Sequence, residues 1–168
     1  IAKLSEGMEV EILTDGGDRA YYSPSQDKIH LPSPGSFTSE YAFNATALHE
    51  LSHATGHPSR LDRDMGGFFG SSQYAYEELV AEMCSCFMGV NLDQTASPDH
   101  INNHKAYVQS WIKAIRDKPE TLIRAIKDAQ SAAAFMDWKA GLITDKEYSQ
   151  TLNSTMEIAT RSRDRDAR

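Results

Sequence analysis

Cysteines and long apolar runs are scarce in this chain of 168 residues. Its two cysteines, Cys84 and Cys86, are two positions apart and would not face each other on a helix. A disulfide framework is therefore excluded, and we expect both thiols to fill the core or stay neutral, with a Cys-x-Cys metal site as the alternative. No stretch is long and apolar enough to span a membrane, and no signal-peptide pattern is present. We therefore expect a cytoplasmic protein without a membrane partner.

An excess of positive charge is also missing. The chain has 24 acidic and 17 basic residues, which give a net charge of −7. This charge repels phosphate backbones, so we do not expect the chain by itself to bind nucleic acid strongly. Hydrophobic residues make up 40% of the sequence, enough to build one sizeable core. The first residue is Ile1 and not methionine, and we expect the chain to be a piece of a longer protein.

A five-residue motif with metal-binding spacing lies in the first third of the chain. It reads His49-Glu50-Leu51-Ser52-His53. On a helix, residues four apart lie on the same face, so both imidazoles can reach one metal ion. Glu50 would then point toward the open coordination position, where it can take a proton from a zinc-activated water. The motif predicts a metal-dependent hydrolase, and two surface histidines on a helix are the alternative.

The motif lies at the end of a predicted helix. Residues 39–55 contain neither proline nor glycine, and apolar residues recur there at helical spacing. Thr38 or Ser39 can cap the beginning of this helix. Gly56 can close it in a left-handed conformation, and Pro58 prevents its continuation. We therefore expect a helix of about four turns whose last turns carry the two histidines.

Two histidines do not hold a catalytic zinc ion, which needs a third protein ligand and one open position. The metzincin motif would place a further histidine at position 59, but that residue is Ser59, and His57 lies two residues too early. A glutamate on the next helix, predicted over residues 73–88, is the other solution. Glu78 and Glu82 share one face of that helix.

We assign the third ligand to Glu78, and Glu82 to the orientation of a ligating imidazole. Glu77 is the main alternative for the ligand. A solvated acidic face of the helix is the reading without a metal.

Four blocks of sequence occur in a characteristic order. They cover residues 17–24, 49–61, 74–82 and 104–111. Together they resemble the zincin-like metallopeptidase domain of ArdC-type antirestriction proteins, which plasmids and other mobile elements encode. The resemblance covers roughly residues 15 to 137 and implies a gluzincin-type site, in agreement with Glu78. It also implies an N-terminal domain that binds single-stranded DNA and is missing here. Ala54 stands where an aromatic residue is expected in many relatives, a departure that concerns the shape of the pocket.

The predicted elements have an α+β order, mostly helical with a small sheet. Alternating polarity predicts a strand over residues 8–13, and extended chain follows over 20–22 and 28–32. Pro32 predicts that the last of these strands lies at an edge of the sheet. An edge beside the site could pair with an extended peptide substrate, whereas a plain solvated edge is the alternative.

The rest of the chain is expected to be loop and helix. The glycine-rich segment 60–72 carries Phe68 and Phe69 and predicts either a mobile lid or a static hydrophobic plug. Amphipathic helices are expected after Pro98 and after Pro119. Further expectations are a capping box over Thr144–Glu147, a last helix to about residue 160, and a disordered charged tail over 161–168. We expect one zincin-like domain over 1–138, with 139–168 as a C-terminal helix and tail.

His104 is the histidine that interrupts an apolar helix stripe, between Ile101 and Val108. We predict a catalytic role for it, as a donor to the oxyanion that forms during attack on a carbonyl. A hydrogen bond to a site carboxylate such as Glu82 is the alternative. The competing donors are Tyr74, Tyr76 and Tyr107.

The sequence thus predicts a zinc metallopeptidase with a peptide or protein substrate and Glu50 as its base. Manganese is an alternative ion, since His, His and Glu ligands accept both metals. Two other functions stay open at this point: a non-proteolytic antirestriction or DNA-protection module that retains a metal site, and the hydrolysis of a non-peptide amide. No sequence feature indicates an oligomeric state.

Overall fold

Helices make up most of the structure, a computed structural model that describes residues 1–92, 94, 101–102, 104–106, 108–109 and 119–154. The elements are α1 (Ala2–Met8), β1 (Glu11–Leu13), β2 (Tyr21–Ser23), β3 (Lys28–His30), the 3-10 helix η1 (Pro34–Ser36), α2 (Glu40–Ala54), α3 (Ser72–Asn91) and α5 (Pro119–Lys139). A further helical segment covers residues 145–154. This is the α+β architecture that the sequence predicts.

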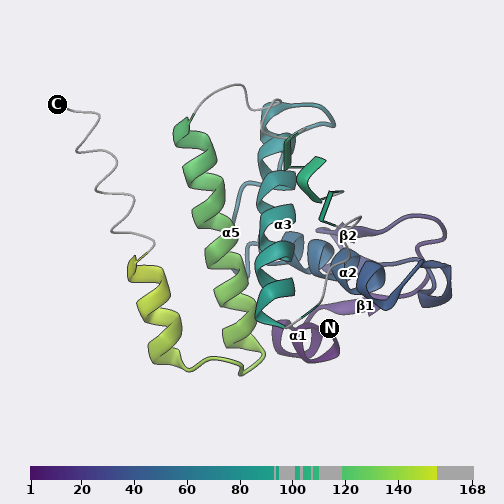
Figure 1. Cartoon of the computed structure of the whole chain (residues 1–168), viewed down its shortest axis with the longest axis horizontal. Coiled ribbons are helices and arrows are strands. Elements are labelled where there is room, and N and C mark those ends of the chain that lie inside the picture. Colours follow the sequence, from purple (N-terminus) through teal and green to yellow (C-terminus); the bar gives the residue numbers. More distant parts are fainter. Residues whose placement is uncertain (93, 95–100, 103, 107, 110–118, 155–168) are drawn as a thin grey trace.

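Helix α3 packs against both α2 and α5 (Figure 1). It runs in the same direction as α5, because the first turns of α3 contact the middle of α5 and the last residue of α3 contacts the end of α5. Tyr76 donates to Asp128 at 2.5 Å, and Asn91 donates to Asp137 at 2.8 Å. The apolar core between the helices includes Leu48, Leu51, Leu79, Met88, Ala129 and Met136. Burial of these side chains fixes α2 and α3 face to face, which positions the motif histidines against α3.

Local sequence sets where α2 and α3 begin. The hydroxyl oxygens of Ser39 and Ser71 each accept a backbone hydrogen bond from the first turn of their helix, at 3.1 Å, so the predicted cap at Ser39 is confirmed. The prediction of a left-handed Gly56 is wrong, since Gly56 does not have a positive φ. A Cβ at Gly56 would lie 2.6 Å from Sδ of Met65. The Met65 side chain of the following loop therefore packs directly on this glycine.

The strands form a three-stranded sheet in the order β1-β3-β2, with β1 parallel and β2 antiparallel to β3. The prediction that the third strand lies at an edge is wrong, because β3 is central. Pro32 lies beyond the last paired residue, His30, and therefore removes no hydrogen bond of the ladder. Among the described residues, β1 and β2 form the two edges of the sheet.

The first residues form a helix where the sequence predicted only the strand over 8–13. That strand is confirmed for its second half, whereas Met8 belongs to α1. Met8 and Leu4 are one turn apart and both 2% exposed, so the pair forms the buried face of this helix. A Cβ at Gly7 would lie 2.3 Å from the backbone oxygen of Lys139. This glycine therefore lets α1 approach the end of α5.

The C-terminal part follows local rules. The capping box is confirmed, since the amide of Thr144 donates to Glu147 Oε2 at 2.8 Å and the amide of Glu147 donates to Thr144 Oγ1 at 3.3 Å. Trp138 and Tyr148 stack with ring centroids 4.7 Å apart, so residues 145–154 pack on the end of α5. The helix expected after Pro98 is helical over 101–102, 104–106 and 108–109. The predicted tail over 161–168 lies outside the described residues. None of the described helices combines the length and apolarity needed to cross a membrane.

Candidate metal centre

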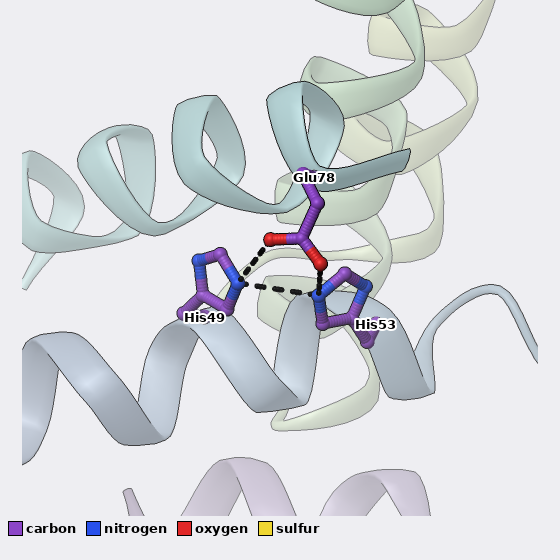
Figure 2. A group of neighbouring side chains, drawn as sticks. All are labelled: His49, His53 and Glu78. Carbon is purple, nitrogen blue, oxygen red and sulfur yellow. Dashed lines mark hydrogen bonds and ion pairs between the residues drawn. The ribbon is translucent and has the colours of Figure 1, made fainter. Parts of the chain in front are cut away.

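Three side chains converge between α2 and α3 (Figure 2). His49 and His53 lie one turn apart on α2, and Glu78 reaches toward both from α3. The Nε2 atoms of the two histidines are 3.2 Å apart. The carboxylate oxygens of Glu78 lie 3.5 Å from Nε2 of His49 and 3.7 Å from Nε2 of His53. The structure thus brings together the three residues that the sequence predicts as ligands.

This set of donors fits a divalent cation. Two imidazoles and one carboxylate, with a fourth position open, form a ligand set of catalytic zinc sites. Burial alone lowers the pKa of His49, but the carboxylates of Glu78 and Glu82 outweigh it and raise the pKa to about 10. A proton on His49 therefore balances part of this negative charge at neutral pH. A cation between the two Nε2 atoms would face the Glu78 carboxylate in place of that proton.

The outer nitrogens of both histidines also face carboxylates. Nδ1 of His49 lies 3.2 Å from Glu82, and Nδ1 of His53 lies 3.2 Å from Glu77. Such contacts hold the proton on Nδ1 and direct the lone pair of Nε2 toward the shared point. Burial would raise the pKa of Glu82, yet the imidazoles of His104 and His49 lower it to about 2, so Glu82 is ionised. Glu77, the alternative for the third ligand, contacts Nδ1 of His53 instead.

Arg63 holds Glu77 in place, and sequence reasoning missed it. Its guanidinium donates to both oxygens of Glu77, at 2.7 Å and 3.1 Å. It also donates to the Thr55 hydroxyl at 2.6 Å and to the Ser52 carbonyl at 2.8 Å, which fixes the loop against the end of α2. Burial would raise the pKa of Glu77, but His53 and Arg63 lower it. The available signal was a basic residue in the loop that follows the motif.

A cavity of about 370 Å³ opens beside the three convergent side chains. Glu50, only 7% exposed, lines it together with Tyr74. Burial and the neighbouring Glu78 raise the pKa of Tyr74 to about 12, so its phenol stays protonated and can donate a hydrogen bond. Strand β2 and the residues that flank it contribute Ala20, Tyr21, Tyr22 and Pro24 to the lining. The strand beside the site is therefore β2, and not β3 as the predicted edge implied.

Comparison with known proteins agrees with this geometry. The zincin-like metallopeptidase family profile matches residues 1–128. The chain belongs to this family. This zincin-like domain is 51% identical to the DNA primase TraC of Escherichia coli over 119 residues. These residues make up 71% of this chain and 11% of the primase. The chain thus spans about a tenth of that relative.

The solved structures that resemble this zincin-like domain include the antirestriction protein ArdC of plasmid R388. Its Mn(II)-bound form has a TM-score of 0.70 and 35% identity, and covers 85% of this chain and 52% of ArdC. Its metal-free form has a TM-score of 0.67 and 34% identity, with 85% and 51% covered. The zincin-like fold is therefore shown, and the chain spans about half of ArdC.

His104 lies behind the zincin-like site and not in it. Its Nδ1 contacts Glu82, and its Nε2 lies 3.3 Å from the hydroxyl of Tyr41. The predicted alternative, contact with a site carboxylate, is thus confirmed. His104 is not among the described residues that line the cavity. Its catalytic role stays a prediction that these contacts do not support.

The other predicted candidates also have partners elsewhere. His57 hydrogen-bonds Ser59, and Tyr76 donates to Asp128. Neither therefore joins the cluster of His49, His53 and Glu78. Tyr107 lies outside the described residues. Tyr74 is therefore the predicted tyrosine donor that the structure places in the cavity.

The glycine-rich loop is not a hydrophobic plug. Phe68 and Phe69 are 79% and 82% exposed, so the predicted static plug is wrong. Gly67 and Gly70 adopt positive φ values of 122° and 87°, which let the chain turn on both sides of the two phenylalanines. The lid stays a prediction.

Proposed function

We propose that this domain hydrolyses peptide bonds with a divalent metal ion held by His49, His53 and Glu78. The observation that carries the proposal is the convergence of the two Nε2 atoms and the Glu78 carboxylate at the wall of a cavity that Glu50 also lines. Zinc suits this ligand set. Manganese is the alternative, supported by the Mn(II)-bound form of ArdC.

Each residue of the cavity would have a distinct task. The bound ion would polarise the substrate carbonyl and make an attacking water more acidic. Glu50 would accept a proton from that water as its oxygen bonds to the carbonyl carbon, and would then pass the proton to the leaving nitrogen. Tyr74 would donate a hydrogen bond to the carbonyl oxygen as negative charge develops there. Glu77 and Glu82 would keep both imidazoles in the ligating orientation.

The proposed substrate is an extended segment of a peptide or protein. Strand β2 is an edge of the described sheet, and its residues Tyr21 and Tyr22 line the cavity. An extended peptide could add to this edge through main-chain hydrogen bonds, which would present successive carbonyl groups to Glu50. The net charge of −7 argues against nucleic acid as the ligand of this domain.

The test is a protease assay on a denatured protein mixture with wild type and Glu50→Gln side by side. Removal of a general base should lower turnover about 10²- to 10⁴-fold. Metal content should stay the same, because the proposed ligands are unchanged, and this provides the control for folding. Equal cleavage by both proteins, or no cleavage by fully metal-loaded wild type, would contradict the proposal.

A second candidate is a non-proteolytic antirestriction module that uses the metal site structurally. The similarity to ArdC, an antirestriction protein, supports this candidate. An interaction module needs the metal for its shape but does not need the base. An antirestriction effect that survives Glu50→Gln and is lost in His49→Ala would favour the module over the peptidase.

A further inference from the structure

A second cluster of metal-ligating side chains lies directly behind the first. Glu82 and Cys86 are one turn apart on α3, and His104 meets them from the segment that follows. One donor atom from each residue lies within 4.8 Å of the other two. Zinc bonds of about 2.0 Å to nitrogen and oxygen and 2.3 Å to sulfur place such donors roughly 3.3–3.5 Å apart in a tetrahedral site. Nδ1 of His104 and Oε1 of Glu82 are in direct hydrogen-bond contact, so these two donors would have to move apart by about 1 Å as an ion enters between them.

The surroundings orient the three donors toward one another. Nδ1 of His104 contacts Oε1 of Glu82, while its Nε2 lies 3.3 Å from the hydroxyl of Tyr41. A ligating histidine typically has such a polar partner on its second nitrogen, which fixes the ring. The side chain of Glu82 is only 9% exposed and that of His104 is 21% exposed, so both are held in place by packing. Cys86 is half-buried, which leaves a route for an ion.

The chemistry of this cluster differs from that of the first centre. The cluster combines a thiol with an imidazole and a carboxylate, whereas the first centre has no sulfur donor. Thiolates favour zinc and other thiophilic ions over magnesium or calcium. We propose that Glu82, Cys86 and His104 form a second metal site, for a thiophilic divalent ion such as Zn²⁺. Ion binding would release two protons, one from the Cys86 thiol and one from the Nδ1 atom of His104 that contacts Glu82, and a water would complete the coordination.

Glu82 connects this second site to the first centre. Its Oε1 contacts His104, and its Oε2 lies 3.2 Å from Nδ1 of His49. An ion in the second site would therefore lie one carboxylate away from a proposed ligand of the first ion. The site does not depend on peptidase activity, and it can be tested by metal binding alone.

Cobalt distinguishes the two sites, because only a thiolate ligand gives an intense sulfur-to-cobalt charge-transfer absorption in the near ultraviolet. Metal-free protein is titrated with Co²⁺ under reducing conditions, and bound cobalt is counted after dialysis. Wild type should bind two equivalents and show this absorption. Cys86→Ala should lose the absorption and one equivalent, whereas the matched control Cys84→Ala should retain both, since Cys84 is buried in the core.

Two further variants complete the test. His104→Ala should lose the second equivalent in the same way, which covers the case in which Cys86→Ala does not fold. His49→Ala should lose the first equivalent and keep the charge-transfer absorption, so failure of the first centre is distinguished from failure of the second. An absorption that persists in folded Cys86→Ala, or its absence from wild type at saturating Co²⁺, would overturn the second site.

Discussion

Glu77 and Glu78 are neighbours on α3 that contact opposite nitrogens of the same histidine, and this difference leads to a prediction. Glu78 lies 3.7 Å from Nε2 of His53, on the side of the proposed ion. Glu77 lies 3.2 Å from Nδ1 and is bound by Arg63. Glu78→Gln should therefore remove metal binding and spare the fold. Glu77→Gln should weaken the fold and largely spare metal binding.

The magnitudes follow from burial. The side chains of Arg63 and Glu77 are only 9% and 7% exposed. Removing one partner of a buried ion pair costs about 3–5 kcal/mol, and a glutamine that keeps one hydrogen bond to Arg63 places Glu77→Gln near the lower value. For a domain of this size each kcal/mol lowers Tm by about 2–4 °C, so Tm should fall by roughly 6–12 °C. Loss of the support to His53 should weaken metal affinity about 10- to 100-fold.

For Glu78→Gln the expected pattern is reversed. Its loss of metal affinity should exceed the roughly 100-fold upper limit for a residue that only supports a ligand. Its metal-free Tm should stay close to that of wild type, because Glu78 has no buried arginine partner among the described contacts. Thermal unfolding of the metal-free proteins and Zn²⁺ competition with a chelating dye measure both effects, with Glu82→Ala expected to have an intermediate affinity. If Glu77→Gln kept the Tm of wild type and lost more metal affinity than Glu78→Gln, the ligand role would belong to Glu77.

Three further predictions concern stability and proton release. Asp27→Asn should lower the free energy of unfolding by about 3 kcal/mol, because the 5% exposed side chain of Arg60 would lose its two 2.8 Å contacts with a carboxylate. Urea titrations measure this loss, and an unchanged midpoint would contradict it. Gly7→Ala should destabilise the fold by about 1–3 kcal/mol, because the new Cβ would meet the backbone of Lys139. This cost should outweigh the better helix propensity of alanine, and a higher Tm would refute the close approach. Binding of the first ion at pH 7 should release about one proton from His49, whose pKa of about 10 keeps it protonated in the metal-free protein, so affinity should fall as pH is lowered. Calorimetry of Cys86→Ala in buffers of different ionisation enthalpy measures this release without the proposed second site, and a buffer-independent heat would contradict it.

Features that depend on neighbours in sequence could be predicted well. The cap at Ser39 and the capping box that begins at Thr144 each need only residues within one turn, and both are confirmed. The same holds for the placement of His49 and His53 on one face of α2, since helical geometry alone decides it. Glu78 and Glu82 were predicted to share a face of α3, and they contact the same histidine, His49.

Several features that depend on distant segments could not be predicted. The position of β3 in the centre of the sheet is set by its pairing with β1, fifteen or more positions earlier, and Pro32 carries no information on that partner. Helix α1 was missed because the polar and apolar residues around Met8 fit a strand pattern equally well. Only the contact of Gly7 with the end of α5 shows why a glycine is needed in that helix.

The roles of the acidic residues on α3 show where local reasoning ends. Spacing places Glu78 and Glu82 on the face toward α2, but it does not say which nitrogen of which histidine each carboxylate reaches. That choice depends on how α3 is rotated against α2, which the burial of Leu79 and Met88 sets. In this rotation Glu77 also becomes buried, and a buried carboxylate must have a cation or several donors. Arg63 meets that need from the loop after α2, so the loop completes the support of His53.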